Sequence, residues 1–327
     1  MPFITLRYKE LFFTNTKTSA NMKKTFKEIA IQWMEEKASF VKRSTLSIYL
    51  LNLENHIFAH FGNKYEITES EVQQFVLQKH ESGLSANTVR DLVTLMKSVM
   101  NYGQRKGWAT YAGWSIRFPH SRQKGEIRVF TIAEQKRLMK HLNENFSFRN
   151  LGLLICLNTG LRIGEICALK WCDIDTVAGT FHIRRTIERI YITDNGKRRT
   201  EIVINTPKTK NSLRDIPISR ELANILRPLK KIANANFYVV NNSPTPLEPH
   251  TYRCYYNSLI SSLKLPKLKF HSLRHTFATR CIESGSDYKT VSVLMGHSCV
   301  GITMNLYVHP NQEQKQRCID KMLRKLG

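Results

Sequence analysis

The sequence predicts a mainly α-helical protein with a small antiparallel β-sheet, arranged as an N-terminal helical domain followed by an α+β domain. Apolar residues recur at three- and four-residue steps through the first third of the chain, which is the spacing of one helix face. Strand signals are confined to the middle, where two segments rich in β-branched residues flank an Asp-Asn-Gly turn. Helical patterns return afterwards and continue to the end.

Composition points to a soluble protein with a polyanionic partner. A chain of 327 residues can form two domains, and a hydrophobic content of 42% is ordinary for soluble proteins. Its 50 Lys and Arg residues against 26 Asp and Glu give a net charge of +24. Such an excess attracts polyanions, with nucleic acid as the first candidate. The alternative is a solvated basic surface without that role.

Cysteine usage and hydropathy indicate the cytoplasm. The seven cysteines are scattered and form no CxxC pair, which favours reduced thiols inside the cell. No apolar run is long enough to span a bilayer, so no membrane partner is expected. The N-terminus also lacks the long apolar segment and cleavage site of a secretory signal.

The N-terminal part is expected to be a leader followed by four helices. Residues 1–23 show no period and are interpreted as the leader. In the domain spanning residues 24–108, helices are expected from Phe26, from Ser44 towards Phe61, after Thr68, and from Ala86 to about Arg105. Thr68 and Glu71 have the spacing of a capping box, which marks a helix start.

Residues 109–128 are interpreted as a linker that lies against DNA, because Trp114, Pro119 and Gly125 interrupt the helical pattern among basic side chains. Thr131 and Glu134 form another capping-box pair at the start of the second domain, residues 129–327.

Within the second domain, helices are predicted through Leu157 and again across Gly164–Trp171. The segments GTFHIRRTIERIYI and TEIVINT then read as strands joined by the Asp194-Asn195-Gly196 turn. After LRDIPI the chain returns mainly to helices. It ends in NQEQKQRCIDKMLRKL, an amphipathic pattern with few neighbours in sequence to cover its apolar side.

The segment from Leu268 to His309 carries the main functional signal. His271 and Arg274 stand three residues apart, so a helix projects them from one face, where they can grip an anion. A Gly296-His297 pair and Tyr307 follow.

Two motifs upstream extend this pattern. NTGLRIGEICALKW places Arg162 three residues before Glu165, and TPKTKNSLRDIPI is a lysine-rich segment with strand character. The chain resembles the tyrosine recombinase (phage integrase) family in the order of its motifs, which is Arg, Lys, His-x-x-Arg, His and Tyr. The resemblance covers roughly the chain from Lys24 to the end. The resemblance implies a helical core-binding domain, then an α+β catalytic domain. It also implies a site-specific recombinase that cuts and rejoins DNA through a 3′-phosphotyrosyl intermediate, without a cofactor or metal.

The resemblance implies a role for each catalytic residue. Arg162 and Arg274 would clamp the scissile phosphate, because guanidinium offers a rigid fork of donors matched to phosphate. Tyr307 would be the nucleophile, since covalent capture splits one difficult displacement into two easier ones. His271 would take the tyrosine proton or return it, and His297 would be a second donor to the phosphate.

Two further assignments keep an alternative. Lys208 would be the general acid that protonates the departing 5′ oxygen, but Lys210 lies two residues on and on the same face of a strand. Glu165 resembles the acidic residue that supports Arg162, although an ordinary helix-surface carboxylate is the other interpretation. Leu306 departs from the threonine often seen before the tyrosine, which we expect to affect packing only.

Zinc is the competing interpretation of the histidines. His271 and His275 are four residues apart on a helix, but no glutamate follows His271 as in HExxH and no cysteine cluster completes a site. His275 is therefore interpreted as a packing residue, and no metal is expected.

The expected partner is double-stranded DNA at specific sites, with a homotetramer on two duplexes exchanging strands through a Holliday junction. The C-terminal helix would dock on a neighbouring subunit or pack within its own. Accessory DNA-bending or directionality proteins are allowed for, but the sequence does not identify them.

Integration and excision of a mobile element is the favoured role, because TPKTKNSLRDIPI looks more like integrases of mobile elements than like housekeeping resolvases. The leader is expected to be too short for a full arm-site binding domain. The alternatives are Xer-like chromosome resolution, DNA inversion, a type IB topoisomerase and a non-catalytic DNA-binding protein.

Overall fold

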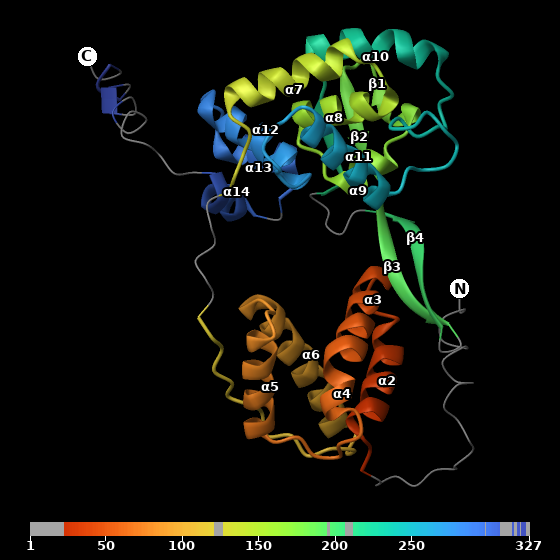
Figure 1. The fold of residues 1–327 in the computed structure, drawn as a ribbon, viewed down its shortest axis with the longest axis vertical. Coiled ribbons are helices and arrows are strands. Elements are labelled where there is room, and N and C mark those ends of the chain that lie inside the picture. The colour runs from red at the N-terminus through yellow and green to blue at the C-terminus, as the bar shows by residue number, and fades with distance from the viewer. Residues whose placement is uncertain are drawn as a thin grey trace. The chain divides into compact units, whose positions relative to one another are not determined.

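Two compact units make up the structure (Figure 1). The first comprises Met1–Gly125 with Arg189–Ile202, and the second comprises Glu126–Glu188 with Val203–Gly327. This computed structural model describes residues 23–120, 127–194, 197–206, 212–297, 299–307, 316, 319–320 and 322–324.

The first unit is helical, as predicted. Its helices are α2 (Phe26–Lys37), α3 (Arg43–Asn52), the π-helix η1 (Leu53–Ile57), α4 (Phe58–Phe61), α5 (Glu69–Glu81) and α6 (Ala86–Arg105). The helix predicted from Ser44 towards Phe61 is therefore present as three consecutive segments, α3, η1 and α4.

Hydroxyl side chains cap α2, α5 and α6, which begin where the sequence predicts a start. The Thr68 hydroxyl accepts a hydrogen bond from the Glu71 backbone N at 3.3 Å, and the Glu71 carboxylate accepts one from the Thr68 N at 2.8 Å. Thr25 and Glu28 form the same reciprocal pair at the start of α2. The apolar faces meet in one core that includes Phe26, Ile29, Trp33, Leu53, Ile57, Phe61, Val72, Phe75, Leu92 and Met96.

The predicted hairpin is present as strands β3 (Thr186–Asp194) and β4 (Lys197–Asn205), and its Asn195-Gly196 turn lies outside the described residues. Its outer part belongs to the first unit. There the Tyr191 hydroxyl donates to the Glu54 carboxylate at 2.6 Å, and the Tyr191 backbone N donates to Ser47 Oγ at 2.6 Å.

The second unit combines helices with a three-stranded sheet. Its elements, besides the inner ends of β3 and β4, are α7 (Ile132–Glu144), α8 (Phe148–Thr159), α9 (Ile163–Ala168), the 3₁₀-helix η2 (Trp171–Asp173), β1 (Ile174–Asp175), β2 (Thr180–Ile183), β5 (Arg214–Pro217), α10 (Arg220–Ile232), α11 (Pro249–Ser262), α12 (His271–Glu283), α13 (Tyr288–Met295) and α14 (Val300–Tyr307). The capping box predicted at Thr131 and Glu134 starts α7.

Two predicted elements differ in detail from those observed. The helix expected across Gly164–Trp171 ends at Ala168, because the chain turns into η2, where the Trp171 indole N–H donates to Asn242 Oδ1 at 3.0 Å. The strand expected along GTFHIRRTIERIYI is two strands, since β2 stops at Ile183 and β3 belongs to a separate sheet. The last predicted helix lies mostly outside the described residues.

Strand alternation in the three-stranded sheet decides which side chains enter the core. The order is β1-β2-β5 with antiparallel pairing, and Phe181 lies opposite Ile216 while Ile183 lies opposite Arg214. Because successive side chains point to opposite faces, Ile216 and Arg214 are buried together. An arginine therefore enters the interior of the second unit.

Helix α8 forms the centre of the second unit. Most of its residues from Asn150 to Thr159 are buried, so it is apolar on nearly all sides rather than on one stripe. It packs against α7 and α12 (Figure 1). Even so, none of the helices that the structure describes has both the length and the apolarity required to cross a bilayer.

Gly164 allows α9 to pack closely on β3. A Cβ atom at this position would stand 2.6 Å from the Ile187 carbonyl oxygen and 2.6 Å from Thr186 Oγ1. No real Cβ atom comes so close to backbone, so a side chain here must push the helix away.

Gly164→Ala should therefore lower the free energy of unfolding by about 1–3 kcal/mol, the usual effect of overpacking. Urea denaturation would measure it. Gly301→Ala in α14 is the matched control, because its Cβ would meet only Cys299 Sγ at 3.7 Å. Equal stability of the two variants would contradict the close packing of α9.

Candidate active site

Two helix C-termini supply the framework of the candidate site. Gly160 follows the last residue of α8 and Gly296 follows the last residue of α13, and both glycines have a left-handed backbone conformation, with φ of 66° and 62°. Glycine adopts this conformation without the strain a Cβ would bring, so it is favoured as a helix terminator. The last carbonyl groups of a helix have no partners within the helix and carry its negative dipole end. They are therefore suited to hold cations.

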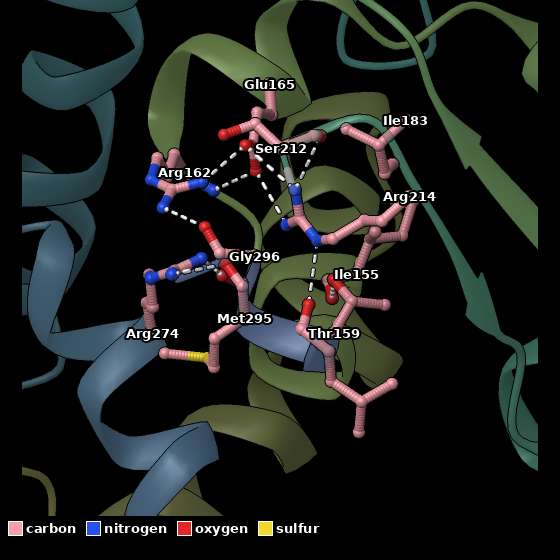
Figure 2. A network of polar contacts seen from close by, with 12 residues as sticks. Ile155, Thr159, Arg162, Glu165, Ile183, Ser212, Arg214, Arg274, Met295 and Gly296 are labelled. Carbon is pink, nitrogen blue, oxygen red and sulfur yellow. Dashed lines mark hydrogen bonds and ion pairs between the residues drawn. The ribbon is translucent and has the colours of Figure 1, made fainter. Parts of the chain in front are cut away.

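Arg274 is held by carbonyls from both helix ends. Arg274 is 1% exposed, and its Nη1 donates to the Gly160 carbonyl at 2.8 Å. Its Nη2 donates to the Met295 carbonyl, in the last residue of α13. The guanidinium is therefore fixed in orientation, one turn after the start of α12 (Figure 2).

Arg162 is held beside it and remains partly open to solvent. It is the residue directly before α9, and its Nη2 donates to the Gly296 carbonyl at 3.0 Å. Its Nη1 donates to Glu165 Oε1 at 2.8 Å, and 35% of its side chain is exposed. Arg162 and Arg274 thus bind the carbonyls of two consecutive residues, Gly296 and Met295 (Figure 2).

Glu165 is a buried carboxylate shared by two arginines. Arg214 Nη1 and Nη2 donate to its two oxygens at 3.0 and 2.9 Å, and the Arg162 backbone N donates at 2.9 Å. Burial alone would raise the pKa of Glu165, but the hydrogen bonds and charge of Arg214, with the charge of Arg162, outweigh it and lower the pKa to about 2. The carboxylate is therefore ionised at neutral pH.

Two imidazoles complete the described part of the site. His297 follows Gly296, and its Nδ1 lies 2.8 Å from the hydroxyl of Thr303 on α14. His271 is the first residue of α12 and is surface-accessible, with its ring edge-on to that of His275 at 4.7 Å between centroids. The charges of Arg162 and Arg274 act on both rings, and that of Arg214 acts on His297 as well.

The surroundings keep both imidazoles neutral. Loss of hydration, together with His275 and the charges of Arg274 and Arg162, lowers the pKa of His271 from 6.5 to about 4. Loss of hydration and the charges of Arg274 and Arg162 likewise lower the pKa of His297 to about 4. Each ring can therefore donate from one nitrogen and accept at the other at neutral pH.

The structure brings together five of the sequence-predicted site residues: Arg162, Glu165, His271, Arg274 and His297. It describes the backbone of Tyr307 at the end of α14, which packs against α12 and α13, but the Tyr307 side chain lies outside the described part. Lys208 and Lys210 lie outside the described residues as well.

Two residues of the site were missed in the sequence. Arg214 was hidden in SLRDIPI, although the alternation of a strand would have placed it on the same face as Ile216. Thr303 carries no distinct sequence signal, yet it is fully buried against His297.

Metal ligation has no support among the described residues, because no three His, Cys, Asp or Glu side chains gather there as they would around an ion. His275, the other half of the predicted zinc alternative, is partly buried on α12, and loss of hydration and the charge of Arg274 lower its pKa.

The neutral imidazoles give a prediction about pH. Protonation of His271 and His297 in the DNA-free protein should be seen by NMR with midpoints near pH 4 rather than 6.5. The unfolded chain then binds protons that the folded chain excludes, so the free energy of unfolding should fall as the pH falls from 6.5 towards 4. His271→Gln and His297→Gln variants would assign the signals, and midpoints near 6.5 would contradict the desolvated site.

Sequence comparisons identify relatives of both regions of the chain. A sequence model described as the phage integrase family matches residues 128–314. A second, described as the N-terminal SAM-like domain of phage integrases, matches residues 25–79.

Individual relatives cover most of the chain. A tyrosine recombinase XerC-like protein of Caldanaerobacter subterraneus subsp. tengcongensis is 29% identical over 285 residues, covering 80% of this chain and 72% of the relative. The ICEBs1 integrase of Bacillus subtilis is 24% identical over 289 residues, covering 84% and 75%.

Among solved structures, the Tn1549 transposon integrase in complex with transposon right end DNA matches with a TM-score of 0.72 at 18% identity. The match covers 92% of this chain and 100% of that one. At this identity the likeness establishes the fold.

Proposed function

Because the chain belongs to the phage integrase family, whose members are tyrosine recombinases that cut and rejoin DNA, we propose that it does so through Tyr307. The phenolic oxygen attacks a backbone phosphorus and forms a 3′-phosphotyrosyl link. The bond from phosphorus to the 5′ oxygen breaks, and that oxygen leaves as a hydroxyl. A 5′ hydroxyl of another strand then reverses the step, so joining needs no external energy source.

One observation carries the assignment of the phosphate site. Arg162, directly before α9, and Arg274, on α12, are far apart in sequence, yet they bind the adjacent carbonyls of Gly296 and Met295. Two guanidinium groups are thereby placed side by side with fixed orientation before any substrate arrives. Fixed donors of this kind stabilise the charge that develops on phosphate oxygens in the transition state.

The histidines fit the remaining proton transfers. Nδ1 of His297 lies within hydrogen-bond distance of the Thr303 hydroxyl. We assign the hydroxyl as the donor, which gives the tautomer whose Nε2 carries the proton and donates to the phosphate. His271, neutral because of its low pKa, can accept the phenolic proton of Tyr307. We assign the protonation of the leaving 5′ oxygen to Lys208, with Lys210 as the alternative.

The proposed partner is double-stranded DNA, and the net charge of +24 supports it. We assign the core-binding role to residues 24–108, the linker to 109–128 and catalysis to 129–327. Four protomers would assemble on two duplexes and pass through a Holliday junction, with the C-terminal helix docking on a neighbour. Accessory DNA-bending or directionality proteins would add to this assembly.

Integration and excision of a mobile element is the role we favour. The similarity to the ICEBs1 integrase supports it. Chromosome resolution is the second candidate, because the chain is also similar to a XerC-like recombinase. Sequencing the DNA beside the gene would separate them: an attachment site next to the gene would support integration, and its absence would favour resolution.

Tyr307→Phe should bind target DNA yet form no covalent adduct on a nicked substrate, because phenylalanine lacks the attacking oxygen. Denaturing gel electrophoresis of protein on labelled DNA would measure the adduct against the unchanged chain. An adduct formed by the variant would remove Tyr307 as the nucleophile.

Lys208→Ala should slow cleavage by about 100- to 10,000-fold, the usual contribution of a general acid. A substrate with sulfur at the 5′ bridging position should restore the rate, since a thiolate leaves without a proton. Lys210→Ala is the matched control, and its cleavage rate should be the same with oxygen or sulfur at the 5′ bridging position. Rescue of Lys210→Ala instead would transfer the role to that lysine.

A further inference from the structure

Arg214 is a buried arginine that takes part in no step of the proposed reaction. Its side chain is 5% exposed, on the inward face of β5. It forms a fork with both oxygens of Glu165, and its Nη1 also donates to the Ser212 carbonyl at 3.2 Å. A side chain so enclosed cannot reach a DNA phosphate directly, so its role must be exerted through its neighbours (Figure 2).

One neighbour is the end of α13. Arg214 Nε donates to the Leu294 carbonyl at 2.7 Å. The next two carbonyls along the chain are those of Met295 and Gly296, which hold Arg274 and Arg162. Arg214 therefore fixes the helix turn on which both phosphate-binding guanidinium groups rest.

The other neighbour is Glu165, whose charge Arg214 offsets. Oε1 of Glu165 accepts from both Arg162 and Arg214. Without Arg214, the buried carboxylate would have Arg162 as its remaining cationic partner and would draw that guanidinium into a full ion pair. An arginine paired in this way offers less charge to a phosphate.

We propose that Arg214 is a positioning residue for strand cleavage, which neutralises Glu165 and anchors the end of α13 so that Arg162 and Arg274 stay available to the scissile phosphate. The inference rests on the proposed function.

Replacing Arg214 should slow cleavage without weakening DNA binding. In Arg214→Met the single-turnover rate of adduct formation on a nicked substrate should fall by about 100-fold, the scale of a small misplacement of reacting groups. Affinity for uncleaved DNA should be unchanged within error, since Arg214 is buried. A rate equal to that of the unchanged chain would overturn the proposal.

A second substitution separates positioning from packing. Adding Glu165→Gln to Arg214→Met removes the carboxylate that would compete for Arg162, so the double variant should cleave faster than Arg214→Met alone. A purely structural role predicts that the second change in a buried network adds a further loss. A double variant as slow as Arg214→Met, or slower, would overturn the proposal.

If circular dichroism shows that Arg214→Met does not fold, Arg214→Lys gives the same test. Lysine keeps the charge but cannot reach both Glu165 oxygens and the Leu294 carbonyl, so it should cleave more slowly than the unchanged chain. An equal rate would overturn the proposal.

The matched control is Arg184→Met. Arg184 pairs with Asp215, whose side chain points to the opposite face of the strand, at 2.6 Å, and donates to the Arg214 backbone carbonyl at 3.1 Å. It therefore contacts the same strand without bonding Glu165. This variant should cleave at the same rate as the unchanged chain, and a loss as large as that of Arg214→Met would show that the effect is not specific to Glu165.

The unchanged chain is measured in parallel to separate the two proposals. If it forms no adduct, the proposed function fails. If it forms an adduct and Arg214→Met does so at the same rate, the positioning role alone is refuted.

Discussion

The hydrogen bonds from Arg162 and Arg274 to the carbonyls at the ends of α8 and α13 are the contacts on which the site depends. The two groups satisfy each other's hydrogen-bonding capacity. The terminal carbonyls of a helix lack donors within the helix, and the N–H groups of a buried guanidinium require acceptors. The glycines that end both helices make the geometry attainable, because at Gly160 a side chain would be strained and would also collide with Phe277 and Met295. The proposed phosphate site therefore rests largely on backbone carbonyls.

The groups around these contacts have defined protonation states at neutral pH. Glu165 stays ionised because the hydrogen bonds and charge of Arg214 lower its pKa, while His271 and His297 stay neutral because loss of hydration and nearby arginines lower theirs. A buried ion pair such as Arg214 with Glu165 gains little stability over well-packed apolar side chains. Its retention here is better explained by geometry, since the pair links β5, α9 and the end of α13.

Much of the architecture was predictable from the sequence, because local chemistry decides it. Helix starts at Thr68 and Thr131 follow from capping boxes, and the paired strands β3 and β4 follow from two segments rich in β-branched residues. Arg162 and Arg274 were predicted from motif order, and the structure brings them together. Arg214 was not predicted, because arginine is normally exposed and only the pairing of β5 with β2 buries it. The early end of α9 likewise involves a distant segment that no local pattern reveals, because the Leu169 carbonyl accepts from the Val239 backbone N and the Trp171 backbone N donates to the Phe237 carbonyl.

The most direct test of the central claim is a crystal structure of the chain bound to its target DNA, with vanadate in place of the scissile phosphate and next to the Tyr307 oxygen. It should show Arg162 and Arg274 donating to the vanadate oxygens while Gly160, Met295 and Gly296 still hold the two guanidinium groups. The phenolic oxygen of Tyr307 should lie opposite the 5′ oxygen. If either arginine had left its carbonyl to face away from the vanadate, or if the phenol lay elsewhere in every subunit, the proposed site would be wrong.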